Sequence, residues 1–253
     1  DIYNPWSILN YLKSDCTPDV YWGNTSGNSV IGQLMRASDE DTMQKVYELF
    51  EPGGYVSAPI DLRAVFPDDS RPVAPGMLWS MLYLAGYLTT PDTMLPNNVT
   101  MRRRLRIPNR EIASVYRSEL IERYARAIGG GDRLGALHDA LIAGDAETVR
   151  SQLEVILRDD ASCYDITSEN SAHMLMLGLC FGLPGYADPR SNKEAGYGRF
   201  DIQVEPSDTA VEAFSFVKPA HRPLITVELK YLPKGEAPSD GSELADRLGA
   251  LAH

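Results

Sequence analysis

The chain has 253 residues, of which 43% are hydrophobic, 9% aromatic and 23% charged. This composition is typical of a folded protein and excludes a disordered or fibrous chain. The length suits one large domain or two small ones. With 24 Lys and Arg against 35 Asp and Glu, the formal net charge is −11. This charge disfavours a chain-wide attraction to nucleic acid, so any polyanion must bind a local positive patch.

The cysteines and the apolar stretches of the sequence indicate in which cellular compartment the protein is expected. Cys16, Cys163 and Cys180 are widely spaced and form no C-x-x-C pair. Because an odd number of cysteines cannot complete a set of intrachain disulfides, we expect a reducing, cytoplasmic compartment. The longest nearly uninterrupted apolar stretch, 77–88, is about a dozen residues long, and a membrane span needs roughly 18. We therefore expect no membrane partner.

The first predicted elements are helical. A helix is expected at 4–12, with Asn4 as its N-cap and a proline at its first position, a pattern typical of a helix start. Further helices are predicted at 29–36 and 39–50, followed by a short strand at 55–60. Because the sequence begins directly at a helix cap, we expect it to be a fragment of a longer protein.

The next elements follow the order of a winged-helix module, at about 74–128. An apolar helix is predicted at 73–85, a strand at 87–90, a returning strand at 100–107 and a long amphipathic helix at 108–128.

The densest positive cluster of the chain lies on and just after the returning strand. It consists of Arg102, Arg103, Arg104, Arg106 and Arg110. On a wing, these arginines would contact the phosphates of a nucleic acid. The alternative is a solvated strand edge that its charge protects from aggregation or that pairs with acidic residues. This alternative is favoured, because the cluster is modest against the net charge of −11.

A run of three glycines, Gly129 to Gly131, predicts a boundary within the chain. After it, helices at 134–143 and 147–157 are expected to form an antiparallel pair joined at Gly144-Asp145. The predicted organisation is a mostly helical region at 1–130, a helical connector at 131–159 and a third domain at 160–253.

The third domain carries the candidate chemistry. A helix is predicted at 168–182, capped by Ser168 or Thr167 and apolar nearly all round after its first turn, as expected of a helix buried against a sheet. Two strands follow, at 196–205 and 223–231.

Alternation along these strands gives their side chains directions. Asp201 is expected on the polar side of the first strand, and Glu228 and Lys230 on the polar side of the second, so neighbouring strands would aim all three into one pocket. Two carboxylates at close quarters repel unless they share a proton or bind a divalent cation. Mg²⁺ or Mn²⁺ would fit, and an adjacent lysine would orient or activate a metal-bound water.

The Glu-x-Lys triplet carries little information by itself, because it occurs by chance about once in a chain of this composition. The alternative is an exposed strand edge with a solvated Glu and Lys. Three features favour a site: an apolar run before the triplet, an Asp on a preceding strand, and an earlier helix that begins with a Glu.

This order of helix with Glu, strand with Asp and strand with Glu-x-Lys resembles the PD-(D/E)XK nuclease superfamily. More narrowly, the chain resembles bacterial proteins in which an AAA-ATPase-like domain is followed by a PD-(D/E)XK nuclease-like domain. The segments that carry this resemblance are 3–12, 21–26, 84–89, 107–111, 173–179 and 191–201. The resemblance implies an α/β or α+β fold, with a restriction-endonuclease-like mixed sheet flanked by helices.

The resemblance also implies roles for individual residues. Asp201 and Glu228 match the metal-binding carboxylates, Lys230 the catalytic lysine, and Glu169 the acidic residue of the first core helix, which would also bind the metal. His173 matches a position near the site on the same helix. A buried histidine satisfied by a backbone carbonyl or a carboxylate is an equally good interpretation.

Other positions match the family less closely. Arg199, with Gly196 and Gly198, resembles the turn that delivers the strand bearing the Asp, where a structural role is expected. The family core continues with a second helix, often bearing Gln and Tyr, and a further strand. Only 242–251 can match that helix, and no Gln or Tyr follows Tyr231. No Walker-type G-x-x-x-x-G-K-[ST] is present either.

The function that the resemblance implies is Mg²⁺-dependent hydrolysis of DNA phosphodiester bonds, in a protein that also carries an ATPase-like domain. One alternative is a nuclease-fold module without activity that serves binding or regulation. Another is a nucleic-acid-binding adaptor acting through the arginine cluster, with steep salt dependence and no metal requirement.

Overall fold

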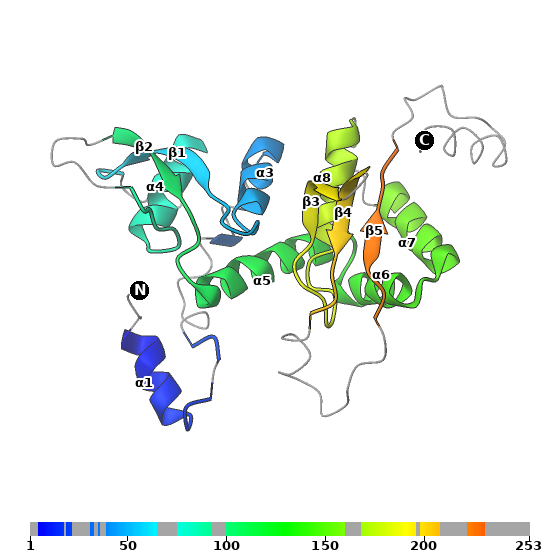
Figure 1. The fold of residues 1–253 in the computed structure, drawn as a ribbon, viewed down its shortest axis with the longest axis horizontal. Helices are drawn as coiled ribbons and strands as arrows, with labels where there is room; N and C mark the ends of the chain where they lie inside the picture. Colours follow the sequence, from blue (N-terminus) through cyan, green and yellow to red (C-terminus); the bar gives the residue numbers. More distant parts are fainter. Residues whose placement is uncertain are drawn as a thin grey trace. The chain divides into compact units, whose positions relative to one another are not determined.

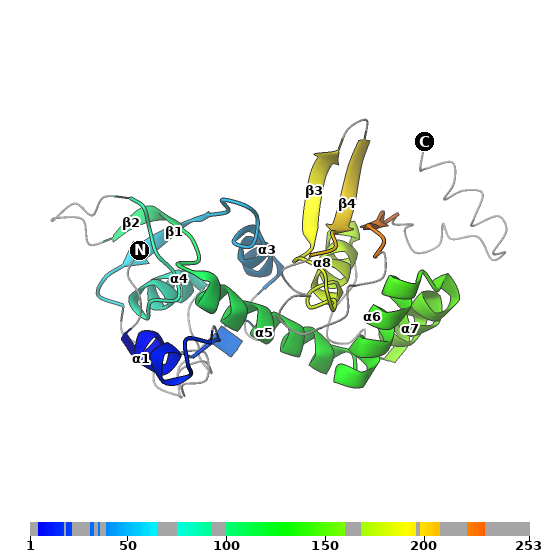
Figure 2. The ribbon, with the colours of Figure 1, turned by 60° about the horizontal axis from the view of Figure 1, so that its bottom comes forward.

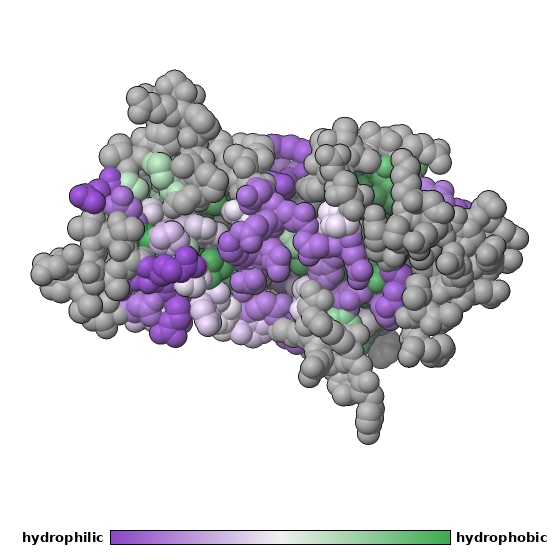
Figure 3. Space-filling model, turned by 90° about the horizontal axis from the view of Figure 1, so that it is seen from above, coloured by the Kyte–Doolittle hydropathy of each residue, from purple (hydrophilic) through white to green (hydrophobic). Residues whose placement is uncertain are grey.

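The computed structural model describes residues 5–17, 19–21, 31–32, 35, 39–64, 75–92, 100–159, 168–195, 198–207 and 222–230. The chain divides into two compact units, Asp1–Arg123 and Tyr124–His253. The fold class is α+β, with helices and two small antiparallel sheets (Figure 1). Within the described residues, no helix combines the length and the apolar character that crossing a bilayer requires. In the view of Figure 3, hydrophilic side chains dominate the described surface and hydrophobic ones form small patches.

The first unit holds a two-stranded sheet and several helices. Its elements are α1 (Pro5–Lys13), α3 (Glu40–Glu48), β1 (Val56–Asp61), α4 (Pro75–Leu84), β2 (Thr100–Leu105) and the start of α5 (Arg110–Ala127). Strands β1 and β2 pair antiparallel along their whole length. The segment 87–90, expected to be a strand, contributes an isolated bridge between Thr89 and Arg106. The winged-helix arrangement of 74–128 therefore stays a prediction.

Local signals explain where the helices of this unit begin. The side chain of Asp39 accepts a hydrogen bond from the Thr42 N–H at 2.9 Å and so caps α3. Helix α4 is tied to β1 by the Ser80 hydroxyl, which accepts a hydrogen bond from the Asp61 N–H at 2.9 Å. The predicted helix at 29–36 lies mostly outside the described residues.

Burial within this unit differs between the sheet and the first helix. Alternate residues of β1, Val56 among them, face the core and are at most 3% exposed, as the period of a strand requires. Helix α1 forms as predicted, but Trp6, Leu9 and Leu12 are 53%, 57% and 59% exposed.

The second unit holds the three-stranded sheet. Its elements are α6 (Gly131–Ala143), α7 (Ala146–Asp159), α8 (Glu169–Leu179), β3 (Arg190–Ala195), β4 (Gly198–Val204) and β5 (Ile225–Val227). The strand order is β3-β4-β5. Both pairings are antiparallel, so the described strands do not form the mixed sheet that was expected. The restriction-endonuclease-like arrangement stays a prediction, and the expected helix at 242–251 lies outside the described residues.

Helix α8 lies beside the hairpin of β3 and β4 in two views (Figure 1, Figure 2). The buried side of β4, Ile202 and Val204, is fully inaccessible. Gly178 of α8 packs directly on the Tyr124 ring, because a β-carbon at this position would lie 2.0 Å from the ring. This close approach requires a residue without a side chain.

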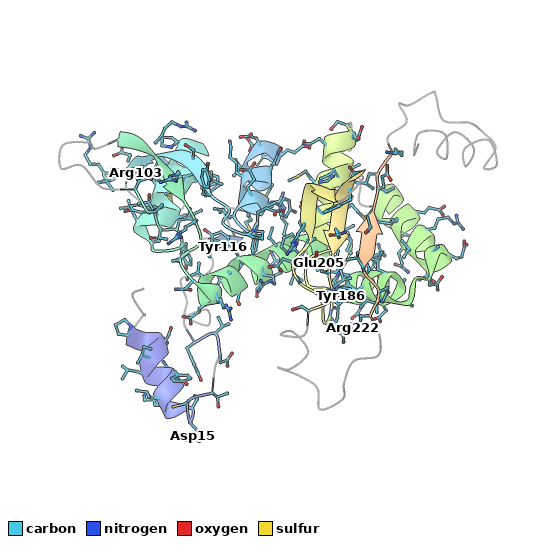
Figure 4. All side chains as sticks on the ribbon, in the orientation of Figure 1. Asp15, Arg103, Tyr116, Tyr186, Glu205 and Arg222 are labelled. Atoms are coloured by element: carbon cyan, nitrogen blue, oxygen red, sulfur yellow. The ribbon has the colours of Figure 1, made fainter. Side chains whose placement is uncertain are left out.

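The chain leading into β5 is anchored at the far end of the sheet. The Tyr186 hydroxyl donates to the Pro223 carbonyl at 3.0 Å, and Arg190 of β3 pairs with Glu205 at 3.2 Å. Figure 4 labels Tyr186, Glu205 and Arg222, which lie in this region. The Tyr186 hydrogen bond to Pro223 and the ladder with β4 thus hold β5, a strand that is only three residues long.

Candidate functional site

The candidate site begins at the first turn of α8. The Ser168 side chain accepts a hydrogen bond from the Ser171 N–H at 3.1 Å, and the Ser171 hydroxyl accepts one from the Ser168 N–H at 3.1 Å. This reciprocal capping box starts the helix at Ser168, as one of the two predicted caps. Glu169 is consequently the first residue of the helix, where the positive end of the helix dipole favours a carboxylate.

The pairing of β4 with β5 brings the second acidic residue to the site. The register pairs Ile202 with Val227, so one step further along the ladder Asp201 comes opposite Glu228. The Asp201 carboxylate accepts a hydrogen bond from the Leu229 N–H, with 2.7 Å between Oδ2 and the nitrogen. Asp201 therefore fixes the chain that follows β5, and it lies on the side of β4 away from the buried Ile202, as predicted.

These elements enclose a pocket of about 250 Å³ lined by Glu169, Asn170, His173, Asp201 and Leu229. Three of these residues were expected at the site from the sequence. Asn170 and Leu229 were not, although Asn170 directly follows Glu169 in the first turn of the same helix. Leu229 is linked to the site by its backbone N–H, which donates to Asp201, and no residue type in the sequence signals such a contact.

His173 connects helix α8 to strand β3 beside this pocket. It is 9% exposed, and its Nε2 lies 2.8 Å from the Ser191 hydroxyl oxygen. Burial lowers the pKa of His173, and the negative charges of Asp201 and Glu169 oppose that shift. The imidazole is therefore neutral at neutral pH and hydrogen-bonds a hydroxyl.

Glu228 and Lys230 form an ion pair with each other. Both residues are exposed, and neither lines the pocket. The hydrogen bond to Glu228 raises the pKa of Lys230, and the negative charges of Glu228, Asp201 and Glu169 act in the same direction, while desolvation opposes them. Lys230 is thus a protonated group within electrostatic reach of both pocket carboxylates.

The side chains near the pocket determine which groups are available to bind the predicted Mg²⁺ or Mn²⁺. Within the described residues, no three His, Cys, Asp or Glu side chains come together as a group that could hold an ion. The pocket does present two carboxylates, Glu169 and Asp201. Mg²⁺ is commonly held by one or two carboxylates and keeps several waters. Binding of Mg²⁺ or Mn²⁺ by Glu169, Asp201 and Glu228 therefore stays a prediction.

The remaining predicted positions lie elsewhere. Arg199 is on β4, opposite Glu194 of β3, and its side chain is outside the described set. The arginine cluster belongs to the first unit, on β2 and at the start of α5. Within it, Arg103 is buried, at 5% exposed, whereas the other four are exposed.

Comparisons with protein-family models, curated proteins and solved structures gave no match to this chain.

Proposed function

We propose that the second unit is a metal-dependent nuclease domain of the PD-(D/E)XK type that hydrolyses phosphodiester bonds in DNA. One observation carries this proposal: Glu169 and Asp201, 32 positions apart in the sequence, line the same pocket. Lys230 lies within electrostatic reach of both. Two carboxylates that can bind a metal ion, with a cation within electrostatic reach of them, are groups that metal-assisted hydrolysis uses.

In this proposal Asp201 and Glu169 hold Mg²⁺ or Mn²⁺, with Glu228 as a further ligand. A bound divalent cation supplies Lewis-acid polarisation and lowers the pKa of a bound water. The hydrogen bond from the Leu229 N–H occupies Oδ2 of Asp201 and so orients the carboxylate.

Lys230 has a distinct part in the proposal. Because its pKa is raised, Lys230 stays protonated at neutral pH and cannot accept a proton from water. It acts instead as a positive charge that stabilises the negative charge developing on the phosphate oxygens. Its ion pair with Glu228 restrains the ammonium group, which also interacts electrostatically with Asp201 and Glu169.

The alternative is a nuclease-fold module without activity that serves binding or regulation. Two observations favour it: Glu228 pairs with Lys230 and does not line the pocket, and no group of three potential ligands forms among the described residues. Both this alternative and the leading proposal include an attached ATPase-like domain as partner.

The test is cleavage of supercoiled and linear DNA with Mg²⁺ or Mn²⁺. Asp201→Asn keeps an oxygen for the Leu229 N–H but removes the charge, and Lys230→Ala removes the cation. We expect each to lower the cleavage rate by about 10²-fold or more. Asp139→Asn is the matched control, since Asp139 is an exposed carboxylate on α6, and it should cleave as the wild type does. Cleavage that persists in both site variants would refute the site, and absence of wild-type cleavage would support the inactive module.

A further inference from the structure

The sheet of the first unit has two different sides. The register pairs Val56 with Leu105 and Ala58 with Arg103 on the buried side. Because side chains alternate along a strand, Arg102, Arg104 and Arg106 share the opposite side, and all three are exposed. Arg103, labelled in Figure 4, therefore lies on the opposite side of the sheet from Arg102 and Arg104, and its side chain is buried in the core.

The three exposed arginines form a row whose length suits a nucleic-acid strand. At a rise of about 3.4 Å per residue, Arg102 and Arg106 are about 14 Å apart along β2. In a B-DNA duplex one strand has a phosphate about every 3.4 Å of helix axis, and the phosphates of an unstacked single strand lie further apart, so this length spans a few phosphates. The strand geometry thus spaces positive groups along a path that several phosphates of one strand can follow.

Arg102 and Arg106, at the ends of the row, have different partners from Arg104 in its middle. Arg102 donates from Nη2 to the Ser57 carbonyl at 2.6 Å, a neutral partner, and no carboxylate among the described residues pairs with it. Arg106 is exposed and pairs through its backbone with Thr89. Arg104 instead binds Asp92 through two side-chain contacts, of 3.0 Å from Nε and 2.9 Å from Nη2.

Arg104 also lies over an aromatic ring. Its guanidinium carbon is 5.9 Å from the centre of the Tyr55 ring, within the range of a cation–π contact. Tyr55 nevertheless remains 54% exposed. Because Asp92 fixes the guanidinium, Arg104 orients the ring and leaves aromatic surface open beside a row of positive charge. Aromatic side chains beside a basic track are the usual arrangement for binding single strands, where bases stack on the ring.

We propose that this side of the β1–β2 sheet binds single-stranded nucleic acid. Arg102 and Arg106 contact phosphates, Tyr55 stacks on a base, and Arg104 positions Tyr55. This function goes beyond the proposed nuclease activity and does not depend on it, because every residue involved belongs to the first unit. Of the arginines that the sequence suggested for nucleic-acid binding, Arg103 cannot contact the ligand because its side chain is buried.

The test is fluorescence anisotropy of a labelled oligothymidylate titrated with the whole chain in EDTA, between about 50 and 200 mM salt. Arg102→Gln and Arg106→Gln should each weaken binding and reduce the slope of log K against log salt by about 0.7. Arg150→Gln is the matched control, because Arg150 is an exposed arginine on α7 and the charge change is identical. Unchanged binding in the first two variants, or an equal loss in the control, would contradict the proposal.

Stacking of a base on Tyr55 is tested with separate substitutions. Tyr55→Ala should weaken binding of the single strand about tenfold, whereas Tyr55→Phe keeps the ring and should bind as the wild type does. A duplex of matching length should bind more weakly, because its bases are not free to stack. Equal affinity for duplex and single strand, or no effect of Tyr55→Ala, would overturn this step. Asp201→Asn should bind normally, so failure of the nuclease proposal and failure of this one give different results.

Discussion

The Asp201 carboxylate accepts a hydrogen bond from the backbone N–H of Leu229 across 2.7 Å. Leu229 lies between Glu228 and Lys230, so this bond holds the Glu-x-Lys segment against β4. The same carboxylate lines the pocket with Glu169 and His173. Asp201 therefore has two separable roles, one in fixing the chain after β5 and one in the charge of the pocket.

Substitution of Asp201 separates these roles. Asp201→Ala leaves the Leu229 N–H without its acceptor and should lower the free energy of unfolding by about 0.5–1.5 kcal/mol. Asp201→Asn keeps an acceptor oxygen and should cost less, while abolishing any metal-dependent cleavage. Urea unfolding measures the free energy of unfolding, and a DNA cleavage assay measures the loss of activity. Gln203→Ala, on the same side of β4, is the control. An equal loss of stability in the Asn and Ala variants would show that the hydrogen bond does not matter.

Gly178 is expected to tolerate no side chain. In Gly178→Ala the new β-carbon would lie 2.0 Å from the Tyr124 ring, so the ring or the helix must move. We expect a loss of about 1–3 kcal/mol from overpacking, measured by thermal or urea unfolding. Gly135→Ala on α6 meets nothing within 4 Å and should raise stability by about 0.5–1 kcal/mol. Similar effects of the two substitutions would contradict the packing described here.

Stability should fall as the pH drops below about 6.5. Burial lowers the pKa of His138, although its hydrogen bond to the Leu179 carbonyl and the charge of Asp139 oppose the shift, and burial likewise lowers that of His173. In the unfolded chain both titrate near 6.5. Below that pH the unfolded state binds more protons, so the histidine contribution to the free energy of unfolding is lost as the pH falls toward the folded pKa values, and it is fully present above about 6.5.

Urea unfolding at pH values from about 7.5 to 5 tests this, because the usual carboxyl groups titrate below that range. His138→Gln keeps a side-chain N–H for the Leu179 carbonyl but does not titrate. It should reduce the pH slope, and a slope identical to that of the wild type would argue against the assignment to His138.

The cysteines should differ in reactivity. Burial raises the pKa of the Cys180 thiol to about 12, and the residue is fully buried, whereas Cys16 is exposed. Because the thiolate is the reactive form, iodoacetamide should modify Cys16 in the native protein and Cys180 after unfolding. Mass spectrometry of the digested protein locates the label. Native labelling at Cys180 would contradict its burial.

Part of this fold and site follows from local sequence signals. Ser168 was a predicted cap for the helix that carries Glu169, and alternation along the strand correctly separated Asp201 from Ile202. Gly144 adopts a positive φ of 69° and ends α6, at the predicted junction of two helices. These features depend on neighbouring residues, whose backbone preferences and periodicity are readable from the sequence.

Other features follow from tertiary pairing. Strand β3 was not predicted, because its residues RSNKEA are polar and lack β-branched side chains; its pairing with β4 makes it a strand. Likewise β2 pairs with β1 rather than mainly with the segment 87–90, and this pairing determines that Arg103 is buried while Arg102 is exposed.

The sequence by itself determined which residue types could do chemistry and, for Asp201, the side of its strand on which it lies. Only the tertiary structure decided that Asp201 binds the Leu229 N–H, that Asn170 joins the pocket and that Glu228 pairs with Lys230. These contacts link backbone and side-chain groups from different elements. Their geometry depends on strand register and on helix packing against the sheet, which local propensity does not specify.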